Sequence, residues 1–125
     1  MFKQTQDVII IGAGPAGLSF ARSLAEAGLN VLIVEKKSKD DLHNPSYDGR
    51  EIALTEQSAD ILKKLGAWNR IDNQLISPIK EAKVLNGNSP YSLNFSDGQN
   101  NLGYLISNHL IRRALYEEIN NFSNV

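Results

Sequence analysis

A single pattern restricts the fold of this chain more than any other: two short apolar runs, joined by a glycine-rich turn and a helical segment. The first run, Val8 to Ile11, is entirely β-branched, which predicts a central strand covered on both faces. Pro15 suits a first helical position and Gly28 suits a helix end, so we expect a helix over about residues 15–27. Asn30 to Glu35 is predicted to be a second strand, parallel to the first by the right-handed crossover rule. Together these elements form one βαβ unit.

The glycines of the turn have the spacing Gly-x-Gly-x-x-Gly, and each has its own physical task. Gly12 permits a tight turn, Gly14 allows a diphosphate to approach the backbone, and Gly17 lets the helix pack closely on the strand. The helix start at Pro15 to Gly17 presents unpaired backbone N–H groups and the positive end of the helix dipole, which attract an anion. The turn is therefore predicted to bind a dinucleotide diphosphate. The alternative is a turn whose glycines are needed only for steric reasons.

Glu35 favours the dinucleotide over the purely steric alternative. It ends the second apolar run 18 residues after Gly17, near the spacing at which a carboxylate accepts hydrogen bonds from a ribose diol. A free carboxylate at this position repels the 2′-phosphate of NADP. The residues alone leave FAD and NAD as the two candidates.

A polar segment and a second helix follow the βαβ unit. Residues 36–50 are mostly polar or charged and include several turn-forming residues, so we expect a surface loop. Thr55 can cap a helix whose inward face carries Ile61, Leu62 and Leu65. A glycine directly after this apolar face is expected to end the helix.

A hairpin and a third helix complete the predicted elements. Asn86-Gly87 is a turn signal between segments in which apolar and polar residues alternate, which is typical of a hairpin with one buried face. The third helix is expected to begin near Ser107, whose side chain can cap it. Its apolar face carries Ile111, Leu115 and Ile119.

Composition excludes several classes of function. The 125 residues include thirteen Lys and Arg against fourteen Asp and Glu, so no overall basic field attracts nucleic acid. Cysteine is absent, and His43 and His109 are far apart without a ligand motif, so we expect exposed histidines and no metal site. No apolar run approaches the roughly 20 residues of a membrane helix, and the N-terminus lacks signal-peptide features. We therefore expect a cytoplasmic protein.

Motifs along most of the chain resemble those of one flavoprotein family. Gly12 to Gly17, which reads Gly-Ala-Gly-Pro-Ala-Gly, resembles the start of FAD-dependent aromatic hydroxylases related to p-hydroxybenzoate hydroxylase. Asp48 to Thr55 and Leu65 to Trp68 are similar to the Asp-x-Arg-x-x-Ala-Leu and Leu-Gly-x-Trp patterns of the ubiquinone-biosynthesis branch. Pro78-Ile79 and Gly103 to Asn108 continue the similarity in order. The resemblance implies an α/β fold: an incomplete, Rossmann-like FAD-binding domain of the GR2 type with a β-hairpin excursion.

The resemblance also implies an activity. Members of this branch are FAD-dependent monooxygenases that hydroxylate an aromatic ring with NAD(P)H and O2, here a small aromatic or polyprenylated phenol of ubiquinone biosynthesis. Full-length relatives are several times longer, so we expect residues 1–125 to be the N-terminal part of an FAD-binding domain, inactive alone. Residues 1–35 would be its dinucleotide-binding unit, and about 79–106 would lead toward the substrate domain. Contact with a membrane surface, or homo-oligomer formation, would come from the remainder of the protein.

Two alternatives stay open. The parent protein could be an FAD- or NAD-dependent oxidoreductase that moves hydride without inserting oxygen, because the glycine fingerprint is common to both classes. The chain could also be a non-catalytic binding or assembly module.

The resemblance assigns roles to the turn and to the acidic residue that follows the second strand. It implies that the three glycines, with Pro15 and Ala16 between them, surround the FAD diphosphate. Glu35 is expected to hold the adenosine ribose. The sequence does not single out a catalytic base.

Three more residues are candidates for contact with FAD. The resemblance places Arg50 beside the cofactor, whereas the residues alone favour a surface ion pair with Asp48 or Glu51. Lys36 is a candidate to flank the adenine, with a solvated lysine cluster as the alternative. Asn108 can reach the cofactor from the start of the third helix, or it can serve only the helix cap.

Overall fold

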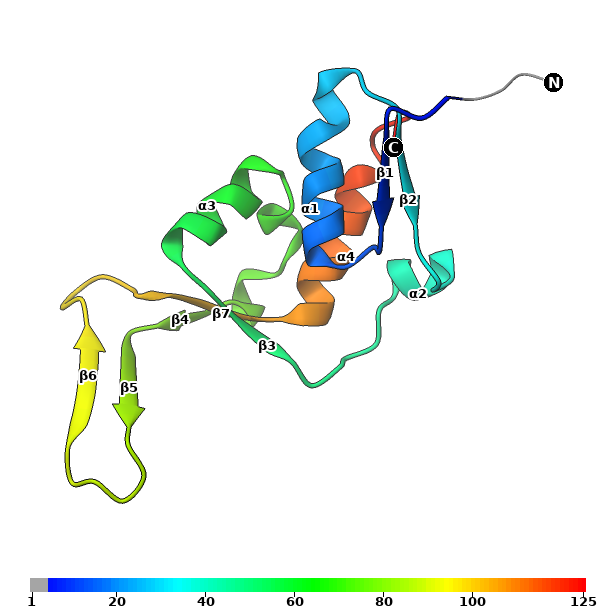
Figure 1. The fold of residues 1–125 in the computed structure, drawn as a ribbon. Helices are drawn as coiled ribbons and strands as arrows, with labels where there is room; N and C mark the ends of the chain where they lie inside the picture. The colour runs from blue at the N-terminus through cyan, green and yellow to red at the C-terminus, as the bar shows by residue number, and fades with distance from the viewer. Residues whose placement is uncertain (1–4) are drawn as a thin grey trace.

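The computed structural model describes residues 5–125. Residues 1–4, on which the signal-peptide expectation partly rests, lie outside the described residues. Figure 1 shows a body of helices and short strands from which one hairpin projects. The helices and strands, in chain order, are β1 (Val8–Ile11), α1 (Pro15–Leu24), β2 (Val31–Val34), α2 (Lys39–His43), β3 (Glu51–Leu54), α3 (Glu56–Lys64), β4 (Ser77–Ile79), β5 (Glu81–Leu85), β6 (Ser92–Ser96), β7 (Gly103–Ser107) and α4 (Asn108–Ile119).

The first βαβ segment folds as its sequence pattern predicts. β1 and β2 pair in parallel, with Val8 opposite Val31 and Ile11 opposite Val34. Pro15 is the first residue of α1, which continues as a 3₁₀ turn and ends at Gly28. Gly28 has a φ of 72°, a left-handed conformation that glycine adopts without a steric penalty.

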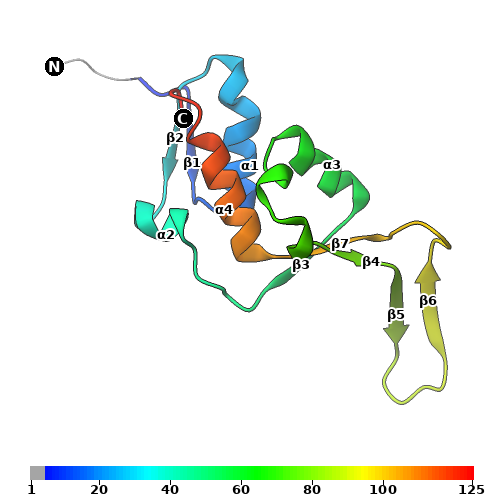
Figure 2. The same cartoon turned by 180° about the vertical axis from the view of Figure 1, so that it is seen from behind.

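The prediction that both faces of β1 are covered is wrong for the described chain. Ile10 is buried, whereas Ile9 and Ile11 on the opposite face are 60% and 79% exposed. Successive side chains of a strand point to opposite faces, and both α1 and α4 lie on the Ile10 side (Figures 1 and 2). Nothing within residues 5–125 covers the other side.

A second small sheet, formed by β3, β7 and β4, packs against α3 and α4. β7 is its central strand, with β3 and β4 antiparallel on either side. α4 follows β7 directly and packs against α1, and Leu18, Ile106 and Leu115 are the largest fully buried side chains of the core between these elements. The chain thus brings the start of α4 close to the start of α1.

α3 begins at its predicted cap. The Thr55 hydroxyl accepts a hydrogen bond from the Ser58 amide, and Gly66 follows the end of the helix with a φ of 82°. Leu62 is buried as expected, but Ile61 is 48% exposed and lines an open pocket. The prediction that Ile61 faces inward is therefore wrong.

The loop predicted for residues 36–50 contains a short helix, α2, that was not predicted from the sequence. The Ser38 side chain accepts a hydrogen bond from the Asp41 amide, and the Asp41 carboxylate accepts one from the Ser38 amide. This reciprocal capping box, together with burial of Leu42, stabilises a single helical turn in a polar segment.

β5 and β6 form the predicted hairpin, but its apolar face is not buried. Val84 lies opposite Leu93, and Ala82 lies opposite Phe95. The side chains of Val84, Leu93 and Phe95 are all at least half exposed. The hairpin extends away from the body in both views, so no described element covers that face (Figures 1 and 2).

Ser107 precedes α4, as predicted, but its side chain does not cap the helix. The Ser107 hydroxyl instead donates to the carboxylate of Glu51 on the neighbouring strand. At 12 residues α4 is longer than the other helices, and none of the helices in residues 5–125 is long and apolar enough to cross a membrane.

Candidate functional site

The three glycines of the turn differ in the space around them, as their separate tasks require. Gly12 has a φ of 99°, which side-chain-bearing residues rarely adopt. A Cβ at Gly17 would collide with the Gly12 carbonyl oxygen and lie 3.3 Å from the Ile10 side chain, so only glycine allows α1 to pack this closely. A Cβ at Gly14 would have no heavy atom within 4 Å. The Gly14 position is therefore open on the side from which a ligand can approach.

The start of α1 has no side chain to cap its amides. Gly14 is the N-cap residue, with an extended backbone and no capping hydrogen bond, and Pro15 occupies the first turn. The first amides of a helix have no partner within the helix, so they are available to a phosphate group. Open space at Gly14 and free amides at the helix start fit the diphosphate of a dinucleotide.

Glu35 connects the end of β2 to this turn. Its Oε2 atom accepts a hydrogen bond of 2.8 Å from the Ala13 amide, and its Oε1 atom accepts one of 3.0 Å from the Lys37 amide. The Ala13 hydrogen bond is the largest cause that lowers the pKa of Glu35, followed by that of Lys37. The carboxylate is thus ionised at neutral pH. Each oxygen has a further lone pair with which to accept a ribose hydroxyl.

Arg50 makes the ion pair that the residues alone favour. Its Nη2 atom lies 2.6 Å from Asp48 Oδ2, and its side chain is 64% exposed. The pKa of Asp48 falls well below its usual range, mainly because of the Arg50 side chain and then because of Asn108. Arg50 remains a candidate for cofactor contact, with its charge already compensated by a carboxylate.

Asn108 does not serve the helix cap with its side chain. Its Nδ2 atom donates to Asp48 Oδ2 at 2.7 Å, and its backbone amide donates to the Arg50 carbonyl oxygen at 2.9 Å. The residue is buried, so these bonds hold the segment before β3 against the start of α4. Lys36 is exposed, as a solvated lysine would be.

An apolar pocket of about 290 Å³ opens beside the glycine turn. It lies between the start of α1, α3, β3 and α4. The residues that line it are Pro15, Ala16, Ser19, Ile52, Leu54, Ser58, Ile61, Leu62, Asn108 and Ile111. Three of the predicted site residues, Pro15, Ala16 and Asn108, therefore share one pocket.

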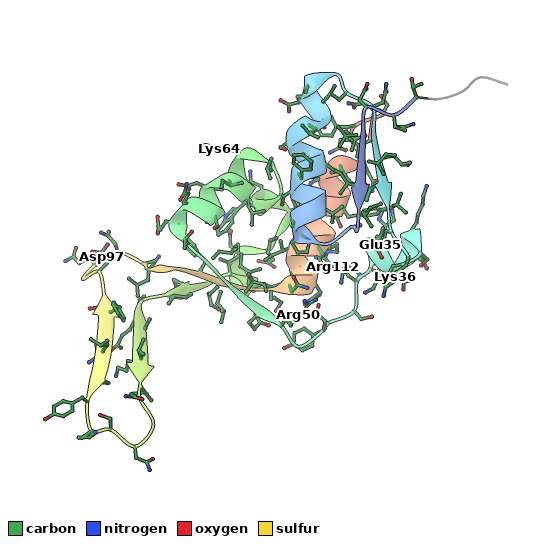
Figure 3. The ribbon with its side chains drawn as sticks, viewed as in Figure 1. Glu35, Lys36, Arg50, Lys64, Asp97 and Arg112 are labelled. Atoms are coloured by element: carbon green, nitrogen blue, oxygen red, sulfur yellow. The ribbon has the colours of Figure 1, made fainter. Side chains whose placement is uncertain are left out.

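Two charged residues at this site were not proposed from the sequence. Asp48 is the carboxylate that joins Arg50 to Asn108, and Arg112 is a buried arginine on α4. Figure 3 places Arg112 near Glu35, and its positive charge contributes to the lowered pKa of Glu35. Arg112 follows Asn108 by four residues, so the helical repeat alone could have placed it on the same face of α4.

The histidines do not form part of a metal site. Within residues 5–125, no three His, Cys, Asp or Glu side chains are grouped to hold an ion. His43 is exposed, but the expectation of an exposed His109 is wrong, because His109 is half buried and packs edge-on against Tyr47 with ring centres 5.4 Å apart.

The turn, the uncapped helix start and the ionised carboxylate after β2 define a dinucleotide-binding domain of the Rossmann type. The chain belongs to the FAD binding domain family, whose model matches residues 5–122. This finding resolves the choice between FAD and NAD that the residues left open.

Relatives and solved structures agree with this assignment. The chain is 50% identical over 126 residues to ubiquinone hydroxylase UbiM of Neisseria meningitidis, covering 95% of this chain and 27% of that protein. It is 32% identical over 111 residues to ubiquinone hydroxylase UbiL of Rhodospirillum rubrum, covering 87% of this chain and 26% of that protein. The fold matches p-nitrophenol 4-monooxygenase PnpA from Pseudomonas putida with a TM-score of 0.72 at 21% identity, over 99% of this chain and 31% of that one. The predicted fold class is confirmed, and the chain spans about a quarter of the length of these curated relatives.

Proposed function

We propose that this chain is the FAD-binding part of a monooxygenase that hydroxylates a phenolic ring in ubiquinone biosynthesis, with NAD(P)H as reductant. The observation that carries the proposal is the 50% identity to a ubiquinone hydroxylase over 95% of the chain. Identity at this level covers both the glycine turn and the segment from Asp48 to Asn108. The bound FAD would supply the redox and oxygen chemistry.

The residues of the chain have binding and orienting roles in this proposal. The amides at the start of α1 hold the diphosphate, where Gly14 leaves room for it. Glu35, already oriented by the Ala13 amide, accepts the hydroxyls of the adenosine ribose. Arg50 and Asn108, joined through Asp48, form the side of the site next to β3. Lys36 would flank the adenine from the solvent side.

The place of action follows from the proposed substrate. A cytoplasmic protein that hydroxylates a polyprenylated phenol has to meet its substrate at a bilayer surface. We propose that contact with a membrane, and any homo-oligomer, involves segments that correspond to the other three quarters of the longer relatives.

Titration of the purified chain with FAD tests the cofactor site. Gly14→Val places a branched side chain in the open space at the helix start, and we expect it to abolish saturable FAD binding. Ser23→Val, on the exposed far end of α1, is the control and should bind like the native chain. Saturable binding of NAD in place of FAD would contradict the proposal.

A chimera tests the activity, because the relatives are about four times longer than the homologous segment. Residues 1–125 replace the matching segment of the Neisseria enzyme, and the product is analysed by mass spectrometry after incubation with NADH or NADPH, O2 and a prenylated phenol. We expect a product heavier by one oxygen atom. Oxidation of the reductant without any hydroxylated product would favour the hydride-transfer alternative.

A further inference from the structure

Arg112 is a buried cation for which the described chain provides no partner. The residue is 8% exposed, on the second turn of α4. Within residues 5–125 its guanidinium makes no ion pair and no side-chain hydrogen bond, whereas Arg22, Arg50, Arg70 and Arg113 are each paired with a carboxylate. The stem of Arg112 is buried, but its guanidinium nitrogens reach solvent, because no Arg112 atom is among the buried, unpartnered atoms of residues 5–125. These donors are therefore open to an anion that the described residues do not supply.

Two residues near the glycine turn show where Arg112 lies. Asn108, one helical turn earlier on α4, lines the same pocket as Pro15 and Ala16 at the start of α1. Glu35, which accepts a hydrogen bond from the Ala13 amide, is close enough for the positive charge of Arg112 to lower its pKa. Figure 3 shows Arg112 and Glu35 near each other beside the start of α4. Arg112 therefore lies on the part of α4 near Glu35, whose carboxylate is bonded to the glycine turn.

Glu35 is not the partner that Arg112 lacks. Both oxygens of Glu35 accept backbone hydrogen bonds, from Ala13 and Lys37, and the guanidinium of Arg112 is outside ion-pair distance. The effect of Arg112 on the pKa of Glu35 is the smallest of the causes. Arg50, the other arginine at this site, is compensated by Asp48. Arg112 thus contributes an uncompensated positive charge beside the turn.

A buried polar atom without a partner lies one turn away from Arg112. The Nδ1 atom of His109 is buried and has no hydrogen-bond partner among the described residues. His109 and Arg112 are three residues apart, so they are neighbours on the surface of α4. The first two turns of α4 therefore hold more donors and acceptors than the chain itself satisfies.

We propose that Arg112 binds a phosphate oxygen of the FAD diphosphate and orients the cofactor between the start of α1 and Glu35. The proposal rests on the proposed function, and it adds a binding residue from α4 to those of the turn. A guanidinium suits this task because it is always charged and offers a planar set of donors that matches phosphate in bidentate geometry. The phosphate would supply the negative charge that no carboxylate among the described residues provides to Arg112.

Paired substitutions at neighbouring arginines test the proposal. Arg112→Met replaces the side chain by an apolar one of similar length, and Arg112→Lys keeps the charge but not the fork of donors. Arg113→Met is the matched control, because Arg113 is the next residue, half exposed and paired with Glu117. FAD affinity is measured for each protein at low and high salt. Thermal unfolding is measured without FAD.

We expect Arg112→Met to weaken FAD binding by about 10- to 100-fold, the range for loss of a charge-assisted hydrogen bond, and to reduce its salt dependence. Arg112→Lys should fall between this variant and the native chain, and Arg113→Met should bind normally. Without FAD, Arg112→Met should unfold at the same temperature as the native chain, because the substitution removes no ion pair and no hydrogen bond among the described residues and keeps the buried apolar stem.

Other outcomes would overturn the proposal. Normal FAD affinity of Arg112→Met would show that the guanidinium does not meet the cofactor. A lower unfolding temperature without FAD, together with a loss of affinity equal to that of an unrelated destabilised variant, would assign Arg112 a purely structural role. Failure of the proposed function is distinguishable, because the native chain itself would then show no saturable FAD binding.

Discussion

The carboxylate of Glu35 accepts a hydrogen bond from the Ala13 amide across 22 positions of sequence, and this bond joins the end of β2 to the glycine turn after β1. Glu35, which is expected to bind the ribose, therefore also stabilises the glycine turn that is expected to bind the diphosphate. One substitution at this position should affect both stability and affinity.

Glu35→Gln should lower the free energy of unfolding by about 1 kcal/mol at pH 7, a value reduced for partial solvent exposure. The pKa of Glu35 is lowered in the folded chain, so its stabilising effect is present above the unfolded value of 4.5 and is lost as pH falls through the lower folded value. Denaturant unfolding from pH 7 to pH 3 measures this. The difference between native chain and variant should be constant above about pH 5.5 and shrink below pH 4.5. A difference that grows on acidification would contradict the assignment.

Gly17→Ala and Gly14→Ala should act in opposite ways. At Gly17 the new Cβ collides with the Gly12 carbonyl oxygen, so we expect a loss of about 1–3 kcal/mol in stability. At Gly14 the Cβ meets nothing, and the loss of backbone freedom in the unfolded chain should stabilise by about 0.4–1 kcal/mol. Denaturant unfolding gives both values. FAD titration should show weaker binding for Gly14→Ala despite its greater stability.

Glu118 links α4 to Arg22 on α1 and to Arg70 in the turn after α3, so it should contribute more to stability than Glu117. Its side chain is 12% exposed and contacts Arg22 at 3.3 Å and Arg70 at 2.8 Å. Glu118→Ala leaves two cations without this partner, and we expect a loss of about 2–3 kcal/mol in stability. Glu117→Ala is the control, because the more exposed Glu117 pairs only at 3.7 and 3.9 Å, and it should cost less than about 1 kcal/mol. Equal effects in thermal unfolding would show that the Glu118 contacts carry no particular weight.

The cap of α3 gives a fourth expectation. Thr55→Ala removes the hydroxyl that accepts from the Ser58 amide, and it should cost about 1 kcal/mol in the free energy of unfolding. Thr55→Ser keeps the hydroxyl and should remain within about 0.5 kcal/mol of the native chain. If both variants unfold alike, the cap contributes no measurable stability.

Local patterns predicted β1, β2, the β5–β6 hairpin, α1, α3 and α4, but not α2 or the strands β3, β4 and β7. The glycine spacing, Pro15 and Gly28 each impose a backbone requirement that neighbouring residues do not change, so β1, α1 and β2 could be placed from the sequence. Glu35 followed from its distance along the chain. The cap of α3 was likewise predictable, because capping involves residues three apart.

What the sequence did not reveal depends on contacts between distant segments. Burial of Ile9 or Ile61 is decided by which elements cover a face, and strand or helix periodicity does not contain that information. The Asp48 bridge to Asn108 spans 60 positions, and the isolation of Arg112 shows only when every carboxylate is located. Ser107 was correctly placed at the helix start, but its hydroxyl donates a hydrogen bond to Glu51 on the adjacent strand β3 instead of capping the helix.

The uncovered face of the β1–β2 pair has a practical consequence for work on this chain. Ile9 lies opposite Leu32 and Ile11 opposite Val34, so four apolar side chains form one exposed patch. Such a patch binds apolar dyes and favours self-association. Colloidal behaviour, rather than affinity for FAD, will therefore limit the protein concentration that titrations can reach, and salts that strengthen apolar contacts will lower that limit further.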